Sequence, residues 1–299
     1  MTPWNQAAKT LNTVRDLIRF AVTQFSASQA YFGHGYPGPL EEASYLVLHA
    51  LGLPHDERAL WLDAQLLPAE RQSALNLVQR RIDERIPAAY LTREAWLGPF
   101  RFYVDERVIV PRSFIADALH EGLESWIDDF ESLDRVADIC TGGGSLAVLL
   151  ALKCPNAGVD AVDLSTDALA VAAKNVADYG LEDRVHLHRG DLFEGLLPGA
   201  YDLIVSNPPY VDAAAMAALP AEYLKEPRMA LESGADGLDH VRRLLADAPK
   251  FLKPEGLLVV EVGHQRDALE DAFPHLPLVW LALPAGDSYV FVVRREDLV

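Results

Sequence analysis

The chain has 299 residues, enough for about two domains with cores of their own. Half of the residues are hydrophobic and only two are cysteines, which is typical of an ordinary globular protein and not of a disulfide-stapled or low-complexity chain. Asp and Glu number 44 against 26 Lys and Arg, so the net charge is −18 and the surface is poorly suited to neutralising nucleic-acid phosphates. Such acidity either attracts a basic partner or serves solubility alone.

We expect no targeting or membrane segment in this sequence. Its first residues have neither the basic nor the apolar region of a signal peptide, and the longest apolar runs, such as residues 146–152, are too short to span a bilayer. We therefore expect a soluble, cytoplasmic protein. Cys140 and Cys154 fit no metal-binding or redox spacing, so we expect both to be reduced, inert thiols.

The N-terminal part is predicted to be helical. Apolar residues recur every three or four positions in residues 17–25 and 45–51, the spacing of amphipathic helices. A loop dense in glycine and proline, residues 32–39, separates the two. No catalytic motif occurs here, so we expect an all-helical domain over residues 1–88 without an active site of its own.

A β-hairpin is predicted to link this domain to the next, over residues 89–112. Alternating apolar residues at 100–104 and the apolar run 108–110 flank a short polar stretch, the pattern of two paired strands and a turn. An amphipathic helix is expected to follow, over residues 114–130.

The remainder, residues 113–299, alternates predicted strands with predicted helices. This order favours an α/β fold with a doubly wound, mostly parallel sheet. The last two apolar runs are joined by a short link, so they are expected to form an antiparallel pair at one sheet edge. The predicted strands are 136–140, 159–163, 185–188, 201–205, 257–262, 278–283 and 289–293, and the predicted helices are 145–153, 166–179 and 238–252.

A glycine-rich loop, residues 138–145, joins the first of these strands to its helix. Its glycines allow a ligand to approach the backbone closely, and the helix start offers unpaired N–H groups. Gly142, Gly144 and Ala147, with Asp163 as the ribose acid, also satisfy the dinucleotide fingerprint. The loop alone therefore allows either a nicotinamide dinucleotide or an adenosine-type cofactor, and a purely structural turn is a third reading.

Carboxylates near the loop favour the adenosine-type cofactor. Asp138 precedes the loop, where a cation is favoured and a pyrophosphate is not. Asp191 ends the third strand, where it could bind an exocyclic amine, although it could equally be a strand-end cap. Together with Asp163 they indicate a positively charged, adenosine-containing cofactor, which is S-adenosylmethionine.

The sequence Asn207-Pro208-Pro209-Tyr210 directly follows a predicted buried strand, where open α/β sheets place their ligands. The two prolines remove backbone donors and leave their carbonyls as acceptors, and the Asn207 amide adds an acceptor oxygen. This turn suits a planar NH₂ group, with Tyr210 as a stacking wall. A rigid turn without a ligand is the alternative.

These features together resemble a class I S-adenosylmethionine-dependent methyltransferase acting on an NH₂ nitrogen. The fuller pattern is similar to the HemK-type protein glutamine methyltransferases over nearly the whole chain. The stretches that carry this similarity are Arg85-Ile86-Pro87-x-x-Tyr90-Leu91, Phe100-x-Phe102, Val110-Pro111-Arg112 and Glu226-Pro227-x-x-Ala230-Leu231.

Two substrates are implied by this family, translation release factors and the third large-subunit ribosomal protein. Residues 33–35, 219–223 and 233–239 resemble the ribosomal-protein branch, whereas release-factor enzymes usually follow Pro-Arg with Pro and an acid and this chain has Ser113 there. Gly143 and Leu192 are departures, the second at a position that often carries an aromatic beside the adenine. The helical domain is then expected to recognise the substrate.

The resemblance implies a set of site residues. The expected catalytic residues are Asn207, Pro208, Pro209 and Tyr210. The expected cofactor-binding residues are Asp138, Cys140, Thr141, Gly142, Gly144, Asp163, Leu164, Asp191, Leu192 and Asn207.

The implied reaction is methylation of a glutamine side-chain nitrogen on a basic ribosomal protein. A nucleic-acid amino methyltransferase shares the Asn-Pro-Pro-aromatic turn but should have a basic groove, so no direct nucleic-acid contact is expected. A nicotinamide dehydrogenase and a non-catalytic adenosine-binding module are further alternatives. His186 and His188 share a strand face, but without a third ligand we expect no metal. Glu261 is expected to have a structural or helix-capping role.

Overall fold

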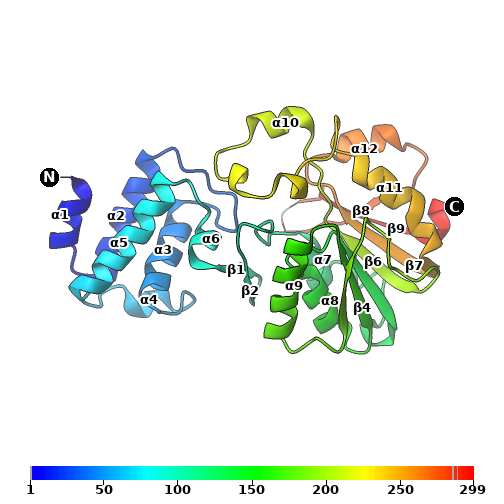
Figure 1. Cartoon of the computed structure of the whole chain (residues 1–299), viewed down its shortest axis with the longest axis horizontal. Coiled ribbons are helices and arrows are strands. Elements are labelled where there is room, and N and C mark those ends of the chain that lie inside the picture. Colours follow the sequence, from blue (N-terminus) through cyan, green and yellow to red (C-terminus); the bar gives the residue numbers. More distant parts are fainter. Residues whose placement is uncertain (1, 285, 288) are drawn as a thin grey trace. The chain divides into compact units, whose positions relative to one another are not determined.

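A computed structural model describes residues 2–284, 286–287 and 289–299 (Figure 1). The chain forms two compact units, Met1–Ala95 with Pro220–Lys225, and Trp96–Leu219 with Glu226–Val299. The short segment Pro220–Lys225 is therefore separated in sequence from the rest of the first unit. Within the described ranges, no helix combines the length and apolar character that a membrane span requires.

The first unit is helical, as predicted, and consists mainly of α1 (Pro3–Thr10), α2 (Val14–Ala27), α3 (Pro39–Ala50), α4 (Arg58–Trp61), α5 (Pro68–Asp83) and α6 (Ala88–Thr92). A capping box starts α2: the Thr13 hydroxyl accepts from the Asp16 N–H at 3.2 Å, and the Asp16 carboxylate accepts from the Thr13 N–H at 3.1 Å. The core of this unit lies among α2, α3 and α5, where Leu17, Leu46 and Val78 are fully buried.

The β-hairpin is formed by β1 (Glu94–Leu97) and β2 (Phe100–Tyr103). The predicted pairing of residues 100–104 with 108–110 is therefore wrong, because residues 100–103 pair with the preceding strand. Gly98 has a φ of +59° and supplies the tight turn between the strands. After Asp105 the chain turns without a strand, and the Val108 N–H donates to the Asp105 carbonyl at 3.1 Å.

The helix expected over residues 114–130 is much shorter, because α7 covers only Ile115–Glu121. It ends at Gly122, whose N–H donates to the Ala118 carbonyl at 2.8 Å. Asp129 then caps a separate 3₁₀ turn, Phe130–Ser132, with its carboxylate. Asp side chains compete with helical hydrogen bonding in this way, so the apolar spacing overestimated the helix.

The second unit is built on a seven-stranded sheet of order β5-β4-β3-β6-β7-β9-β8. Neighbours from β5 to β7 are parallel, and β9 runs antiparallel to β7 and β8, which confirms the predicted topology. Ala285 and Ser288 of the predicted link between the last two strands lie outside the described residues. The strands are β3 (Arg135–Ile139), β4 (Gly158–Asp163), β5 (Val185–Arg189), β6 (Tyr201–Ser206), β7 (Leu252–Glu261), β8 (Val279–Trp280) and β9 (Val290–Arg294).

Helices cover both faces of this sheet (Figure 1). Alternate strand residues point to opposite faces, so Leu203 packs with α7 and α8 (Ser145–Lys153) while Ile204 packs with α11 (Asp239–Asp247) and α12 (Arg266–Ala272). The predicted helix over 238–252 ends early, since Pro249 follows α11 and Leu252 already belongs to β7. The helices are α8 (Ser145–Lys153), α9 (Thr166–Asp178), α10 (Ala213–Ala218), α11 (Asp239–Asp247) and α12 (Arg266–Ala272), with 3₁₀ turns at Tyr223–Lys225, Arg228–Ala230, Ala248–Lys250 and Arg295–Leu298.

Candidate active site

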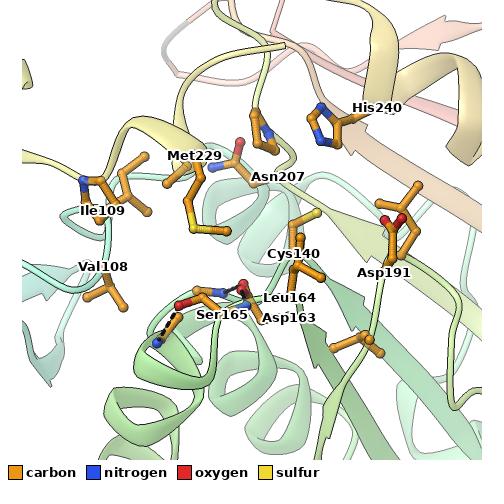
Figure 2. A pocket seen from close by; sticks show the side chains of 18 of the residues that line it. Val108, Ile109, Cys140, Asp163, Leu164, Ser165, Asp191, Asn207, Met229 and His240 are labelled. Carbon is orange, nitrogen blue, oxygen red and sulfur yellow. Dashed lines mark hydrogen bonds between the residues drawn. The ribbon is translucent and has the colours of Figure 1, made fainter.

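The candidate site lies at the carboxyl ends of the parallel strands in the second unit. β3 is paired with β4 on one side and with β6 on the other, so the chain order reverses at β3 and the loops after it diverge there. Such a switch point is where open α/β sheets bind their ligands. A pocket opens at this point, lined by Arg107, Val108, Ile109, Cys140, Gly142, Val162, Asp163, Leu164, Ser165, Ala168, Gly190, Asp191, Leu192, Asn207, Pro209, Pro227, Met229, Ala230 and His240 (Figure 2).

The glycine loop reaches the pocket in a left-handed conformation. Cys140, Gly142 and Gly144 have φ angles of +62°, +54° and +78°. A Cβ at Gly144 would lie 2.9 Å from the Cβ of Ala172, so this position also lets α8 approach α9 closely. Gly143, a departure from the family pattern, has room for a Cβ, with its nearest neighbours at 3.5 Å.

Asp138 supports the glycine loop through a hydrogen bond and does not line the pocket. Its side chain is fully buried, and its Oδ2 accepts from the Thr141 hydroxyl at 2.6 Å. Burial raises the pKa of Asp138 to about 7. Thr141 is buried as well, so both residues are placed to shape the loop.

Asp163 ends β4, lines the pocket and accepts a hydrogen bond from the glycine loop. Its Oδ2 accepts from the Gly142 N–H and its Oδ1 from the Ser165 N–H, each at 2.8 Å (Figure 2). Burial raises the pKa of Asp163, while these backbone donors act in the opposite direction. Each oxygen keeps further lone-pair capacity, so the carboxylate can also accept from ligand hydroxyls.

Asp191 and Leu192 occupy the β5 side of the pocket. Asp191 Oδ2 accepts from Arg243 Nη2 at 2.8 Å at the surface, so part of its acceptor capacity is engaged. Leu192 has a φ of +54° and is buried, and with Leu164 it provides apolar surface in the pocket lining.

The acceptor turn, residues 207–210, starts directly after β6. Asn207 and Pro209 line the pocket, whereas Pro208 and Tyr210 do not. Asn207 lines the pocket together with Met229 and His240 (Figure 2). The turn thus brings an amide and a proline of the predicted set to the same pocket as Asp163.

Tyr210 is held on the other side of this turn. Its hydroxyl points to Glu261 Oε1 at 3.4 Å, and its carbonyl accepts from Gln265 Nε2 at 3.2 Å. A Cβ at Gly263 would lie 2.5 Å from the Tyr210 ring, so ring and backbone pack without intervening space.

Glu261 connects the acceptor turn to the start of α7. Its Oε2 accepts from the Ser113 hydroxyl at 2.6 Å and from the Phe114 N–H at 2.8 Å, which agrees with the structural and capping role expected. It is 1% exposed, and burial raises its pKa to about 7.

Two of the stretches noted in the sequence meet in this unit. Glu226 is buried, and Arg112 donates to both of its oxygens at 2.6 and 2.8 Å. The Val110 N–H also donates to Glu226 Oε1 at 2.8 Å. Glu226 is thereby fixed just before Pro227, Met229 and Ala230, which line the pocket.

Sequence reasoning missed several lining residues. The sequence pattern assigns Arg107, Val108 and Ile109 to a hairpin, and no local pattern marks Met229 or His240 as lining residues. His240 Nδ1 lies 2.8 Å from the Ser233 hydroxyl, and burial lowers its pKa. The only sequence feature that points toward His240 is the preceding stretch 233–239, which resembles the ribosomal-protein branch of the family.

The histidines of β5 have separate surroundings. His188 Nε2 lies 2.7 Å from Asp160 Oδ1, and His186 is exposed. Of the two cysteines, Cys140 lines the pocket and Cys154 is buried, and burial raises the pKa of both thiols.

Comparison with known proteins gives consistent matches. The family model "Methyltransferase small domain" matches residues 110–239, and "PrmC N-terminal domain" matches residues 25–92. The "Ribosomal protein uL3 glutamine methyltransferase" of Neisseria gonorrhoeae is 56% identical over 99% of both chains. That of Bordetella pertussis is 54% identical over 98% of this chain and 99% of its own, and that of Xanthomonas campestris pv. campestris is 45% identical over 98% and 94%.

A solved structure supports the fold. The hMettl16 catalytic domain, crystallised in complex with MAT2A 3'UTR hairpin 6, aligns with a TM-score of 0.52 at 17% identity, covering 76% of this chain and 81% of that one. At this identity the likeness concerns the methyltransferase fold alone.

Proposed function

Because this chain belongs to the family of ribosomal protein uL3 glutamine methyltransferases, we propose that it methylates the side-chain amide of a glutamine in ribosomal protein uL3. The methyl donor is S-adenosylmethionine. The observation that carries the proposal is that one pocket is lined both by Asp163, beside the glycine loop, and by Asn207 of the acceptor turn. One half suits the cofactor and the other suits an NH₂ group.

The residues present fit this cofactor. The loop at Gly142 has a backbone that a ligand can approach closely, and Asp163 beside it retains acceptor capacity for ribose hydroxyls. Leu164 and Leu192 give the apolar surface that an adenine ring needs. When bound, S-adenosylmethionine supplies a methyl group on a positively charged sulfur, which nearby carboxylates favour.

Asn207 is proposed to orient the substrate amide. An amide nitrogen is a weak nucleophile because its lone pair is delocalised. The Asn207 side-chain oxygen, in the pocket lining, and the Pro208 carbonyl, next to it in the turn but outside that lining, would accept the two amide hydrogens and so fix the direction of the nitrogen. The same acceptors stabilise positive charge that develops on the nitrogen. One proton must leave the methylated amide, and water can take it.

Tyr210, which lies outside the pocket lining, is proposed to give this turn its shape. Its hydroxyl is directed to Glu261 and its carbonyl to Gln265. A turn fixed in this way need not reorganise when the substrate binds, and preorganisation of the reactants is worth about 7–11 kcal/mol in well-oriented reactions.

The −18 charge supports a basic substrate, which such a surface would attract from solution. It also argues against a nucleic-acid substrate, since phosphate binding needs clustered Lys and Arg. A modifying enzyme that meets a ribosomal protein before assembly would work in the cytoplasm. The helical domain is proposed to recognise the substrate, which the methyltransferase part then modifies.

The experiment that tests this function uses labelled S-adenosylmethionine with separate acceptors: purified uL3, a release factor and ribosomal RNA. The proposal expects label in uL3 alone, lost when the modified glutamine is replaced by Asn. Label in the release factor or in RNA would instead establish one of the alternative functions.

A further inference from the structure

Three stretches that the proposed chemistry leaves without a role come together inside the helical unit. They are residues 33–35, Arg85, which follows the C-cap of α5, and residues 219–223. The last of these enters the short segment Pro220–Lys225, which belongs to this unit although its neighbours on both sides belong to the other. The segment is therefore held in the helical unit by specific contacts.

Glu222 is the centre of these contacts. It is fully buried, and its Oε1 accepts from Arg85 Nε at 2.7 Å, from Arg81 Nη1 at 3.0 Å and from the Tyr31 N–H at 3.0 Å. Its Oε2 accepts from Arg85 Nη2 at 2.7 Å, so Arg85 binds it through both arms of the guanidinium. Arg81 also donates to Glu42 Oε1 at 2.5 Å, which balances the second buried arginine charge.

The charge of Glu222 is stabilised by this arrangement. Burial alone would raise its pKa, but hydrogen bonds from Arg85, the Tyr31 N–H and Arg81 outweigh burial and bring the pKa to about 2. Removing one member of a buried ion pair leaves the other charge uncompensated. The carboxylate therefore fixes the position of the segment strongly.

The backbone and the aromatic residues around Glu222 also hold the segment Pro220–Lys225 in place. Arg85 has a φ of +55°, at a helix end where glycine would be free of strain. The Tyr223 ring packs on His34 with ring centroids 4.4 Å apart, and its hydroxyl donates to the Gly33 carbonyl at 3.4 Å. A Cβ at Gly33 would lie 2.6 Å from that hydroxyl, so a side chain there would displace Tyr223.

The segment is close in sequence to the acceptor turn and to the pocket. Pro220 follows Tyr210 by ten positions, and Glu226, which Arg112 holds in the other unit, follows Glu222 by four. The loop between Tyr210 and Glu226 is thus anchored at Glu222 as well as at its two ends. It contains α10, none of whose residues is buried.

We propose that Glu222 is a positioning residue: clamped by Arg81 and Arg85, it holds the loop after the acceptor turn in the conformation that receives the protein substrate. The inference rests on the proposed function. Because Glu226 anchors the return of the chain separately, loss of Glu222 frees the loop but leaves the cofactor side of the pocket in place.

The test compares Glu222→Gln with Glu42→Gln. Both carboxylates are buried and both accept from Arg81, but only Glu222 lies on the segment. We expect Glu222→Gln to lower kcat/KM for uL3 by about tenfold or more, because small displacements at a reacting centre cost up to about a hundredfold. The Kd for S-adenosylmethionine should stay unchanged, and proteolysis should newly cut between Val211 and Leu219.

A second pair of variants tests the same role if the Glu222→Gln protein does not fold. Arg85→Ala removes the two-armed contact from a partly exposed position, and Arg80→Ala removes an exposed arginine on α5 that pairs with Glu84 instead. Arg85→Ala should lower uL3 methylation with unchanged cofactor binding, Arg80→Ala should not, and Arg85→Lys should restore part of the loss.

The outcomes separate this inference from the proposed function. If the unaltered protein does not methylate uL3, the proposed function is wrong and the inference falls with it. If it does, but Glu222→Gln behaves like Glu42→Gln, or loses cofactor binding in parallel with activity, the positioning role alone is refuted.

Discussion

Asp163 performs two tasks with one carboxylate. It accepts from two backbone N–H groups of neighbouring loops, and it faces the pocket where a ribose would lie. Its contribution to ligand binding can therefore be separated from its contribution to folding only by measuring both.

We predict that Asp163→Ala weakens S-adenosylmethionine binding by roughly 10- to 100-fold, because hydrogen bonds to a charged group are worth about 1.5–3 kcal/mol. Calorimetric titration measures this loss. Asp167→Ala, which removes an exposed acid from the first turn of α9, is the matched control and should bind normally. Equal loss in both variants would contradict the assignment.

Glu261 makes the stability of the protein depend on pH. Its pKa is raised to about 7 in the folded state from an ordinary value of 4.5, mainly by burial. The folded state therefore binds more protons than the unfolded state between these values. The stabilising contribution of protonated Glu261 is complete below about pH 4.5 and is lost as the pH rises through about 7.

Glu261→Gln should remove this dependence. The glutamine oxygen can accept from Ser113 and Phe114, and its NH₂ can donate to the Tyr210 hydroxyl. Denaturant unfolding should show little difference from the unaltered protein at pH 4.5 and a variant that is more stable at pH 8, by up to about 3 kcal/mol. A variant that is less stable at pH 8 would show that the carboxylate is needed in its charged form.

At the scale of elements, the glycine loop depends on one glycine more than on its neighbour. Gly144 combines a φ of +78° with a Cβ position 2.9 Å from Ala172, whereas Gly143 has ordinary contact distances. Gly144→Ala should destabilise the fold by about 1–3 kcal/mol and separate α8 from α9. Gly143→Ala should be nearly neutral in the same thermal unfolding measurement, and similar losses in both would contradict this account.

The elements that the sequence predicts best are those with a strong local signal. α8 begins after three glycines and ends before Cys154-Pro155, and its predicted and observed bounds agree. The predicted hairpin and the predicted helix after residue 114 differ from the structure because apolar spacing there reflects tertiary packing: Val108 and Val110 are buried without belonging to a strand. The spacing of apolar residues reflects which side chains are buried, and buried side chains also occur outside helices and strands.

The candidate site shows the same division. Asp163 and Asn207 can be recognised because each lies at the carboxyl end of a predicted strand of a parallel sheet. Met229 lies in a 3₁₀ turn and His240 in the first turn of α11, and neither follows a predicted strand. The contact of Arg85 with Glu222 joins residues 137 positions apart, so no local pattern could reveal it.

At the scale of the whole molecule, the −18 charge should act on encounter with the substrate. We predict that the association rate with uL3 falls by about tenfold or more between low and high salt, because the Debye length shortens from about 30 Å at 0.01 M to about 3 Å at 1 M. Stopped-flow binding measures the rate, with neutral sucrose at matched viscosity as the control. If the association rate did not change with salt, the prediction would be wrong, and the negative charge would serve solubility only.

The central claim is that this protein methylates a glutamine amide of uL3 that the acceptor turn orients. The most direct test is mass spectrometry of uL3 after incubation with S-adenosylmethionine and either the unaltered protein or Asn207→Ala. The account predicts one added methyl group on one glutamine with the unaltered protein, and little or none with Asn207→Ala despite normal cofactor binding. Full methylation by the variant, or a methyl group on another residue type, would contradict it.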